Sequence, residues 1–356
     1  MTTTRKMILG ITGVTLLLCA EIILRYLQPY PPERVVIDQH TLAPWPDTVT
    51  FLAFGDVNLG RTVGQRILHV DSLFPFRSYD IRKDSADIVF ANLESQISFQ
   101  HGETGHPQYN LIFTAPPEAI AALRASGITA VSTANNHALD YGIDALKETI
   151  DRLRAANIPF VGTSKDKDSL YQPLILKKNN IKIAIFAVSA FVNMTFDGWR
   201  DHIAVPDTVR LGEAIRAVRD SVDVVMVSYH GGVEYTDAPA PKVAAFAEWC
   251  ADHGADIFLG HHPHVTFGLV QRGKSFIIHS LGNFVFYQPQ HYWTQRSYGA
   301  KFRIIRDSGR VSLALDRLIP VNVSMQTRRL TDTTELRKLQ DRTQSLSSFD
   351  LQSYWK

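Results

Sequence analysis

Short apolar runs alternate with amphipathic stretches along most of the chain. Apolar runs bounded by turn residues are typical of buried strands, whereas apolar positions three or four apart predict helices. The predicted strands are 51–54, 86–91, 128–132, 158–161, 174–176, 181–188, 222–228, 256–259, 300–306 and 311–319. The predicted helices are 117–126, 143–156, 209–219, 241–253 and a polar surface helix at about 331–346, followed by a loose tail. This alternation predicts one α/β domain with mixed sheets.

The N-terminus carries an apolar run at 7–20 that follows Arg5 and Lys6. The run has the length of a signal-peptide core, and the basic pair places its N-terminal side in the cytoplasm. We interpret it as an uncleaved signal anchor; a cleaved signal and a buried helix are the alternatives. The predicted division is a signal anchor with a cytoplasmic stub at 1–30, a spacer at 31–48, a domain at 49–325 and a C-terminal helix and tail at 326–356. This division predicts a single-pass protein of the cell membrane with an extracytoplasmic domain.

Charge and cysteine content exclude several classes of protein. The chain has 37 Lys and Arg residues against 35 Asp and Glu, so a net charge of +2 gives no reason to expect nucleic acid as a partner. Two cysteines exclude a disulfide scaffold and a cysteine-rich zinc site. The 13 histidines are more informative, because several of them follow predicted strands.

Five predicted strands end at side chains that can bind metal ions. In α/β sheets ligands bind beyond the carboxyl ends of strands, so such residues from distant parts of the chain can meet in one crevice. Imidazole, carboxylate and amide ligands without thiolate suit Mn, Fe, Zn or Mg at a hydrolytic site. Each residue alone is also typical of a turn, a cap or a loop, but their joint placement favours a centre of two divalent ions. The candidates are Asp56 with Asn58, Glu94 with Asn92 beside it, Asn136 with His137, His230, and His262 with His264.

These residues fall in a series of motifs, in order, over about residues 49–288. The motifs are Gly55-Asp56-Val57-Asn58-Leu59-Gly60-Arg61, Asn92-Leu93-Glu94, Asn135-Asn136-His137-Ala138-Leu139-Asp140-Tyr141-Gly142, His230-Gly231-Gly232-Val233-Glu234-Tyr235, Gly260-His261-His262-Pro263-His264-Val265 and Ser280-Leu281-Gly282-Asn283-Phe284. Together they resemble the CapA-type poly-γ-glutamate capsule biosynthesis proteins of the calcineurin-like metallophosphoesterase superfamily. The resemblance implies a four-layer α/β/β/α sandwich with its site at the strand ends.

The resemblance also implies roles for individual residues. One metal ion would be bound by Asp56, Asn58, Glu94 and His264, and the other by Glu94, Asn136, His230 and His262. His137 would be the general acid, oriented by Asp140. Asn58 stands where the superfamily usually has His, and Glu94 where it usually has Asp. We expect Arg61, Glu234 and Asn283 to contact the substrate, with Arg61 pairing with its phosphate or carboxylate.

Two other patterns indicate no function here. Residues 268–275 match the P-loop expression, but the apolar residues 276–278 that follow predict a strand where a P-loop needs a helix. We therefore expect a hairpin turn without bound nucleotide. Asn193-Met194-Thr195 matches a glycosylation pattern that has meaning only in a eukaryotic secretory host.

Two functions remain open at this stage. The first is a membrane-anchored, metal-dependent hydrolase acting outside the cytoplasm on a phosphoester or an amide-linked anionic polymer, and taking part in poly-γ-glutamate capsule synthesis or processing. The alternative is a non-catalytic component of a capsule assembly or export complex, which would hold the polymer in the same crevice. Either function allows capsule-synthesis subunits as partners.

Overall fold

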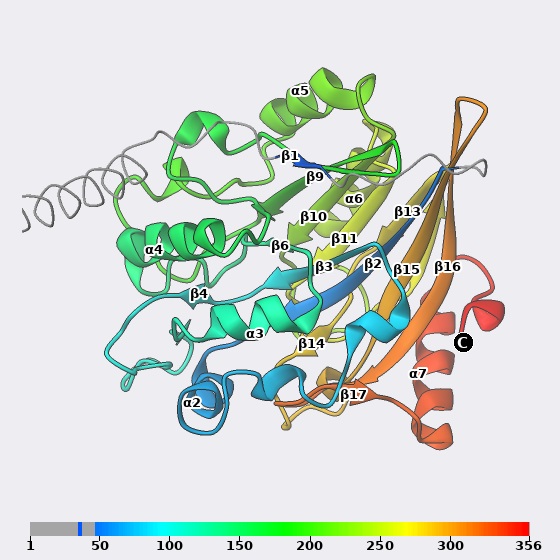
Figure 1. The fold of residues 1–356 in the computed structure, drawn as a ribbon. Helices are drawn as coiled ribbons and strands as arrows, with labels where there is room; N and C mark the ends of the chain where they lie inside the picture. Colours follow the sequence, from blue (N-terminus) through cyan, green and yellow to red (C-terminus); the bar gives the residue numbers. More distant parts are fainter. Residues whose placement is uncertain (1–34, 38–46, 356) are drawn as a thin grey trace, which may run out of the picture. The chain divides into compact units, whose positions relative to one another are not determined.

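The computed structural model describes residues 35–37 and 47–355, and these described residues lie in one compact unit (Figure 1). The predicted anchor at 1–30 lies outside the described residues. Within the described ranges, no helix is both long enough and apolar enough to cross a membrane.

Two mixed β-sheets form the centre of this unit. Sheet A has the strand order β1-β8-β9-β10-β11-β13-β12, in which β9, β10, β11 and β13 are parallel neighbours. Its strands are β1 (Val35–Ile37), β8 (Leu174–Lys178), β9 (Ile181–Ser189), β10 (Val224–His230), β11 (Ile257–His261), β12 (Leu269–Arg272) and β13 (Ser275–Ile278).

Sheet B has the order β17-β16-β15-β2-β3-β6-β7, with β14 paired to the end of β2. Its strands are β2 (Asp47–Val57), β3 (Ile88–Leu93), β6 (Ala130–Ser132), β7 (Phe160–Val161), β14 (Asn283–Val285), β15 (Arg296–Asp307), β16 (Arg310–Asn322) and β17 (Arg328–Arg329). A small separate sheet pairs β4 (Gln96–Ile97) with β5 (Thr114–Ala115).

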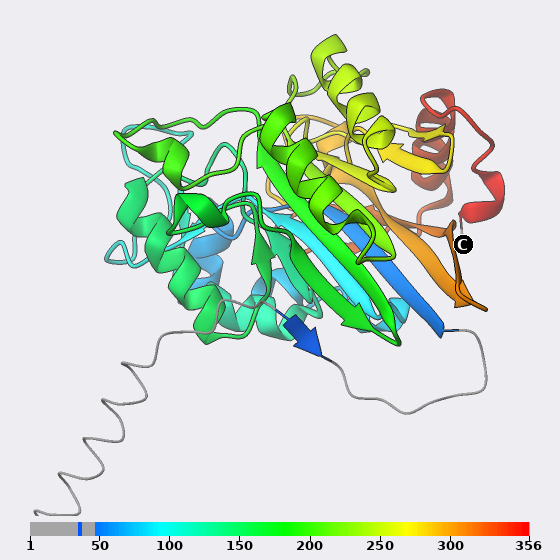
Figure 2. The same ribbon diagram turned by 90° about the horizontal axis from the view of Figure 1, so that it is seen from above.

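Side chains alternate between two cores along the strands of sheet A. On β9, Ile183 and Ile185 join the larger core, which also contains the apolar side chains of sheet B, whereas Ala184 and Phe186 join a second core. This is the two-residue period of a strand buried on both faces. Sheet A therefore packs on sheet B with one face and on helices with the other (Figures 1 and 2).

The helices cover the sheets and support their strand ends. Helices α5 (Thr208–Arg219) and α6 (Pro241–Asp252) fill the second core against sheet A, while α2 (Arg61–His69), α3 (Ala119–Ser126) and α4 (Gly142–Ala155) contribute to the larger core with sheet B. The remaining helices are α7 (Thr333–Ser345) and the short 3-10 turns η1 (Phe74–Phe76), η2 (Ile81–Asp84), η3 (Lys167–Ser169), η4 (Trp199–Asp201), η5 (Trp293–Gln295) and η6 (Gln352–Tyr354). The predicted mixed α/β fold is confirmed.

The C-terminal tail differs from the prediction. Leu351 is fully buried, and the ring of Trp355 packs edge-on against Tyr298 with 5.9 Å between ring centroids. The backbone N–H of Ser348 donates to Leu269 O at 3.0 Å. The prediction of a loose tail is wrong, because apolar residues of this segment complete the larger core.

The P-loop-like stretch forms a hairpin. Strands β12 and β13 are antiparallel, with Arg272 opposite Ser275, and Gly273 has the left-handed backbone (φ 58°) that a tight turn requires. No helix follows the turn, so the predicted hairpin is confirmed.

Candidate metal centre

The register of the strands brings the predicted ligands to one edge of both sheets. In sheet B, Asp56 on β2 lies opposite Asn92 on β3 and opposite Asn283 on β14. In sheet A, His230 on β10 lies opposite His261 on β11. Both rows stand at the carboxyl ends of parallel strands, where α/β folds hold their ligands.

The Asn92 side chain joins the two rows. Its Nδ2 donates to Asp56 Oδ1 at 2.8 Å and lies 3.1 Å from His230 Nδ1. The other ring nitrogen of His230 is 2.7 Å from Asn136 Oδ1, and Asn136 lies in the loop after β6. Four strand ends thus meet in one buried cluster.

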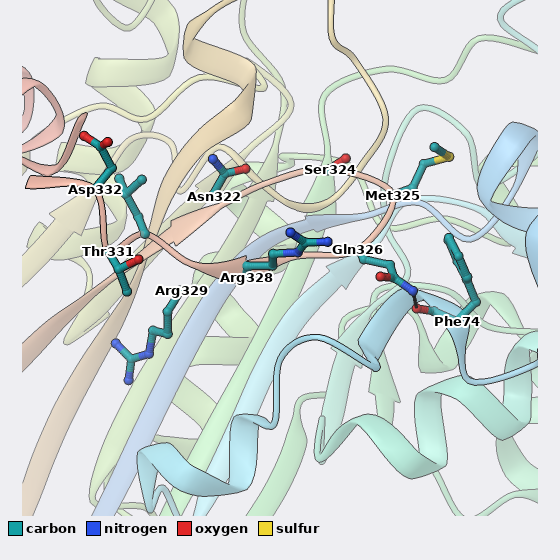
Figure 3. A pocket seen from close by; sticks show the side chains of 10 residues that line it. Phe74, Asn322, Ser324, Met325, Gln326, Arg328, Arg329, Thr331 and Asp332 are labelled. Atoms are coloured by element: carbon teal, nitrogen blue, oxygen red, sulfur yellow. Dashed lines mark hydrogen bonds between the residues drawn. The ribbon is translucent and has the colours of Figure 1, made fainter. Parts of the chain in front are cut away.

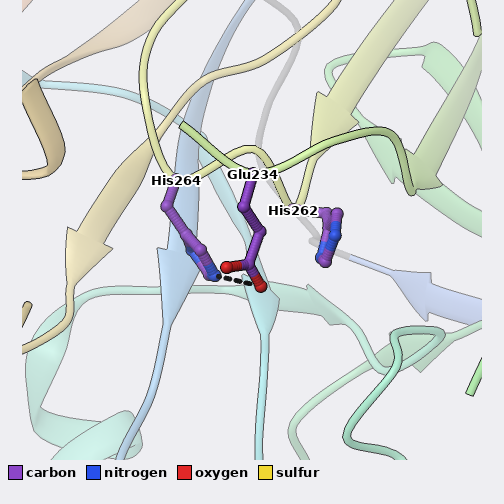
Figure 4. A group of neighbouring side chains, drawn as sticks. All are labelled: Glu234, His262 and His264. Carbon is purple, nitrogen blue, oxygen red and sulfur yellow. Dashed lines mark ion pairs between the residues drawn. The ribbon is translucent and has the colours of Figure 1, made fainter. Parts of the chain in front are cut away.

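Two groups of three side chains lie close enough together to hold a metal ion. Ligand atoms of Asp56, Glu94 and His230 all lie within 4.8 Å of one another, and so do those of Glu234, His262 and His264 (Figure 4). The groups adjoin, since His264 Nε2 is 3.8 Å from Glu94 Oε1 and His264 Nδ1 is 3.5 Å from Asp56 Oδ2. By distance, His230 lies with Asp56 and Glu94, and Glu234 lies with the two later histidines. The ligand sets implied by the resemblance stay a prediction.

The charges in the first group favour a bound cation. Burial raises the pKa of Glu94 well above its usual value, and the nearby Asp56 carboxylate adds to this effect. Burial alone would also raise the pKa of Asp56, but contacts with His261 and His264 hold it well below the usual value. Glu94 Oε1 is buried without a hydrogen-bond partner. A divalent cation beside Glu94 would stabilise its charged form and would satisfy this oxygen, so the residues present fit a metal ion.

The second group fits a metal ion by different criteria. Burial lowers the pKa of His262 to about 3, with the neighbouring His264 as a further cause, and its Nδ1 is buried without a partner. A neutral imidazole with a free nitrogen is the form that binds metal. His262 (φ 96°) and His264 (φ 60°) both adopt left-handed backbone conformations, which cost energy for residues other than Gly. Such strain at two neighbouring histidines is typical of a functional site.

A histidine–aspartate pair stands beside the two groups. His137 Nδ1 is 2.7 Å from Asp140 Oδ2, and its Nε2 is 3.8 Å from Glu94 Oε1. The Phe113 ring stacks on His137 at 3.9 Å, and the Phe113 N–H donates to Asp140 Oδ2 at 2.9 Å. Burial raises the pKa of Asp140, and the contact with His137 opposes this shift. The pair is held so that Nε2 of His137 faces the metal-binding groups.

Some predicted site residues have other contacts in the structure. Asn58 Oδ1 accepts a hydrogen bond from the Gly60 N–H at 2.8 Å, so it stabilises the turn after β2. Asn283, expected to contact the substrate, is fully buried, and its Oδ1 lies 3.0 Å from His264 Nδ1. Asn283 therefore lies next to a candidate metal ligand, and its contact with the substrate stays a prediction. Glu234 lies beside His264 Nε2 at 3.9 Å and is partly exposed.

Sequence reasoning missed Asn193 and His261 at the site. Asn193 was assigned only to a glycosylation pattern, yet its Oδ1 accepts from Asn136 Nδ2 at 3.1 Å and its Nδ2 is 3.2 Å from His137 Nδ1. His261 Nδ1 lies 3.3 Å from Asp56 Oδ1. The Gly-His-His run could have identified His261 as a site residue. Asn193 lies in a loop without periodicity, and its sequence gives no such indication.

Cavities in the described part of the chain include two of similar size. One, of about 480 Å³, is lined by Arg61 and by residues of the β4–β5 connection. The other, of about 440 Å³, lies around the connection from β16 to β17 and the residues after β17 (Figure 3). The second cavity contains none of the predicted site residues, and its Arg329 pairs with Asp84.

Comparison with known proteins agrees with this geometry. In this chain two packed mixed sheets carry carboxylate, amide and imidazole groups at their strand ends. A crystal structure of a Staphylococcus aureus protein assigned as a 5'-nucleotidase shares this fold, with a TM-score of 0.50, 15% identity and coverage of 83% of this chain and 58% of that one. This likeness concerns the fold alone.

Residues 50–288 match the family model described as bacterial capsule synthesis protein PGA_cap. The match covers more than half of the chain, so the chain belongs to this family, and the resemblance to CapA-type proteins is confirmed. The capsule biosynthesis protein CapA of Bacillus anthracis is 28% identical over 285 residues, which are 78% of this chain and 68% of the relative. The PGA biosynthesis protein CapA of Bacillus subtilis is 28% identical over 255 residues, which are 70% of this chain and 65% of the relative.

Proposed function

We propose that this chain is a metal-dependent hydrolase that acts on an anionic substrate during poly-γ-glutamate capsule synthesis or processing. The observation that carries the proposal is the pair of adjoining groups, Asp56 with Glu94 and His230, and Glu234 with His262 and His264. The buried, unpartnered Glu94 Oε1 lies between His264 and His137. Two relatives are named for capsule or PGA biosynthesis, and this supports a role in poly-γ-glutamate capsule synthesis.

The residues divide into those that hold metal and those that move a proton. Two divalent ions would be held by the two groups, with Asn136 contributing its amide oxygen beside His230. Ions bound there would supply the Lewis acidity that activates water for hydrolysis. His137 would donate a proton to the leaving group from Nε2, while Asp140 holds the opposite ring nitrogen. N/O ligands admit Mn, Fe, Zn or Mg.

The proposal includes the placement of the domain outside the cytoplasm. The apolar run at 7–20 after Arg5 and Lys6 would anchor the chain in the cell membrane, and the domain at 49–325 would carry the site. Poly-γ-glutamate and capsule-synthesis subunits would be reachable from that side. A C-terminal reporter that works only outside the cytoplasm should then be active, and one that works only in the cytoplasm should be inactive.

Metal content and turnover test the proposal together. The full chain, loaded with Mn²⁺ or Zn²⁺, should bind metal and cleave γ-glutamyl oligomers or bis-p-nitrophenyl phosphate. Glu94→Gln should lose metal and activity, because the amide cannot supply a charged ligand at the centre. Glu118→Gln is the matched control, since this exposed side chain precedes α3 and makes no cap hydrogen bond. Metal binding and polymer binding without any turnover would refute hydrolysis and favour the non-catalytic capsule component.

A further inference from the structure

The cavity at the start of α2 adjoins the proton-donating pair. Its wall comes from the first turns of α2 and from the connection between β4 and β5. The guanidinium of Arg61 lies 5.5 Å from the centre of the Phe113 ring, and that ring stacks on His137. On another side, Glu103 accepts a hydrogen bond from the hydroxyl of Tyr141, the residue after Asp140. The Phe113 ring thus lies next to both the Arg61 guanidinium at the cavity wall and His137.

Arg61 is fixed in place at the cavity wall. Its backbone is left-handed (φ 50°), and its N–H donates to Thr104 O at 2.7 Å. One terminal nitrogen, Nη2, donates to the backbone oxygen of Asn110 at 2.8 Å and to the side-chain oxygen of the same residue. Arginine carries five donors, and because Nη2 is engaged with Asn110, Nε or Nη1 remains to donate a single hydrogen bond to a carboxylate. Holding the guanidinium in advance lowers the entropy that binding an anion would cost.

The cavity contains one fixed positive and one negative side chain. Glu103 lines the same cavity as Arg61, together with Gln65, Thr104 and His106. Gln65 Nε2 donates to Thr104 Oγ1 at 2.8 Å, and His106 Nδ1 lies 3.1 Å from the Gln108 N–H. A phosphate dianion would meet repulsion from Glu103 that Arg61 only partly offsets. A monoanion with an N–H donor would satisfy both charged side chains.

We propose that this cavity binds a carboxylate-bearing amide unit of the substrate, with the carboxylate on Arg61 and the amide N–H toward Glu103, and that it rejects phosphate dianions. The inference rests on the proposed function, because it names the substrate class for that site. It favours an amide-linked anionic polymer over a phosphoester as the substrate, a choice that the metal centre alone leaves open. Each unit of a γ-linked glutamate polymer carries one free carboxylate and one amide N–H, and so has the required chemistry.

Direct binding of small probes tests this cavity without any need for turnover. The probes are N-acetylglutamine, its neutral α-amide and methyl phosphate, each titrated by calorimetry into the full chain after chelator treatment, so that phosphate cannot bind through metal ions. Circular dichroism checks that the treated chain is folded. We expect N-acetylglutamine to bind at least about 10-fold more tightly than either of the other probes, the range of a charge-assisted hydrogen bond.

Matched variants assign the effect to the two charged residues. Arg61→Gln should weaken N-acetylglutamine binding by about 10–100-fold and leave the neutral amide unaffected, with Arg61→Lys in between. Glu103→Gln should weaken N-acetylglutamine binding and strengthen methyl phosphate binding. Arg66→Gln is the control, because Arg66 is exposed on the same helix and does not line the cavity.

The outcomes separate this inference from the proposed function. Selective binding that depends on Arg61, in a chain that hydrolyses nothing, would refute the proposed hydrolysis and uphold the cavity's role. Equal binding of N-acetylglutamine and its neutral amide, or unchanged binding in Arg61→Gln, would overturn the inference even if the metal-loaded chain is an active hydrolase.

Discussion

Replacement of Asn283 should weaken metal binding although this residue is not a proposed ligand. The Asn283 side chain is fully buried, and its Oδ1 lies 3.0 Å from His264 Nδ1. Because a carboxamide oxygen only accepts, His264 donates from Nδ1 and keeps a free lone pair on Nε2, which faces Glu94 and Glu234. Asn283 Nδ2 donates in turn to Gln288 Oε1 at 3.0 Å, which fixes the amide orientation.

Asn283→Ala removes the group that sets both the tautomer and the orientation of His264. The loss of such a supporting partner typically costs 10–100-fold in metal affinity, or about 1.4–2.7 kcal/mol. Asn283→Asp keeps an oxygen that accepts from His264 Nδ1, so it should lose less metal affinity than Asn283→Ala. Mn²⁺ titration of the full chain by calorimetry measures the effect. Ser297→Ala is the control, since this buried hydroxyl donates to Leu281 O and touches no proposed ligand. Wild-type affinity in a folded Asn283→Ala variant would refute the reasoning.

Three further changes probe other parts of the chain. His137→Ala should retain metal and lose about 10²–10⁴ in hydrolysis rate, the usual cost of a lost general acid; loss of metal content would contradict its role. Lys274→Ala should alter neither metal content nor hydrolysis, because the residue sits in a hairpin turn, and a loss of ATP binding on this change would overturn that interpretation. Burial lowers the pKa of His279 to about 4, below its unfolded value of 6.5, so its stabilising contribution is complete above about pH 6.5 and declines as the pH falls toward 4. Urea unfolding at pH 7 and pH 4.5 should show wild type losing about 2–3 kcal/mol more than His279→Leu, and equal losses would argue against this.

The metal candidates could be predicted because each of them follows a strand with a clear apolar pattern. Parallel pairing of β2 with β3, and of β10 with β11, then puts Asp56 beside Asn92 and His230 beside His261. Placement at strand ends was therefore enough to predict that these side chains meet. It was not enough to divide them into groups, because that depends on how the two sheets face each other.

The position of Asn283 could not be predicted from local pattern. Strand β15 pairs with β2 only as far as Ala53, and β14 takes its place beside Asp56. For β14 to replace β15 beside β2, the two backbones must approach closely at Gly55, where a Cβ atom would lie 1.8 Å from Gly282 O. Such a contact between segments far apart in sequence leaves no periodic signal.

Two residues in connections and one helix were missed by the sequence analysis. Phe113 and Asn193 lie in connections without periodicity, although both contact His137. Helix α2 was missed although its buried Val63 and Ile67 stand four positions apart, which is the spacing of a helix face.

Metal stoichiometry and position test the central claim most directly. Anomalous diffraction from crystals of the Mn²⁺-loaded chain should show two adjacent ions, one among Asp56, Glu94 and His230 and the other among Glu234, His262 and His264. Crystals of His262→Ala should lose or weaken the second ion and keep the first. An ion-free cluster in the loaded wild type, or ions bound only elsewhere, would contradict the account.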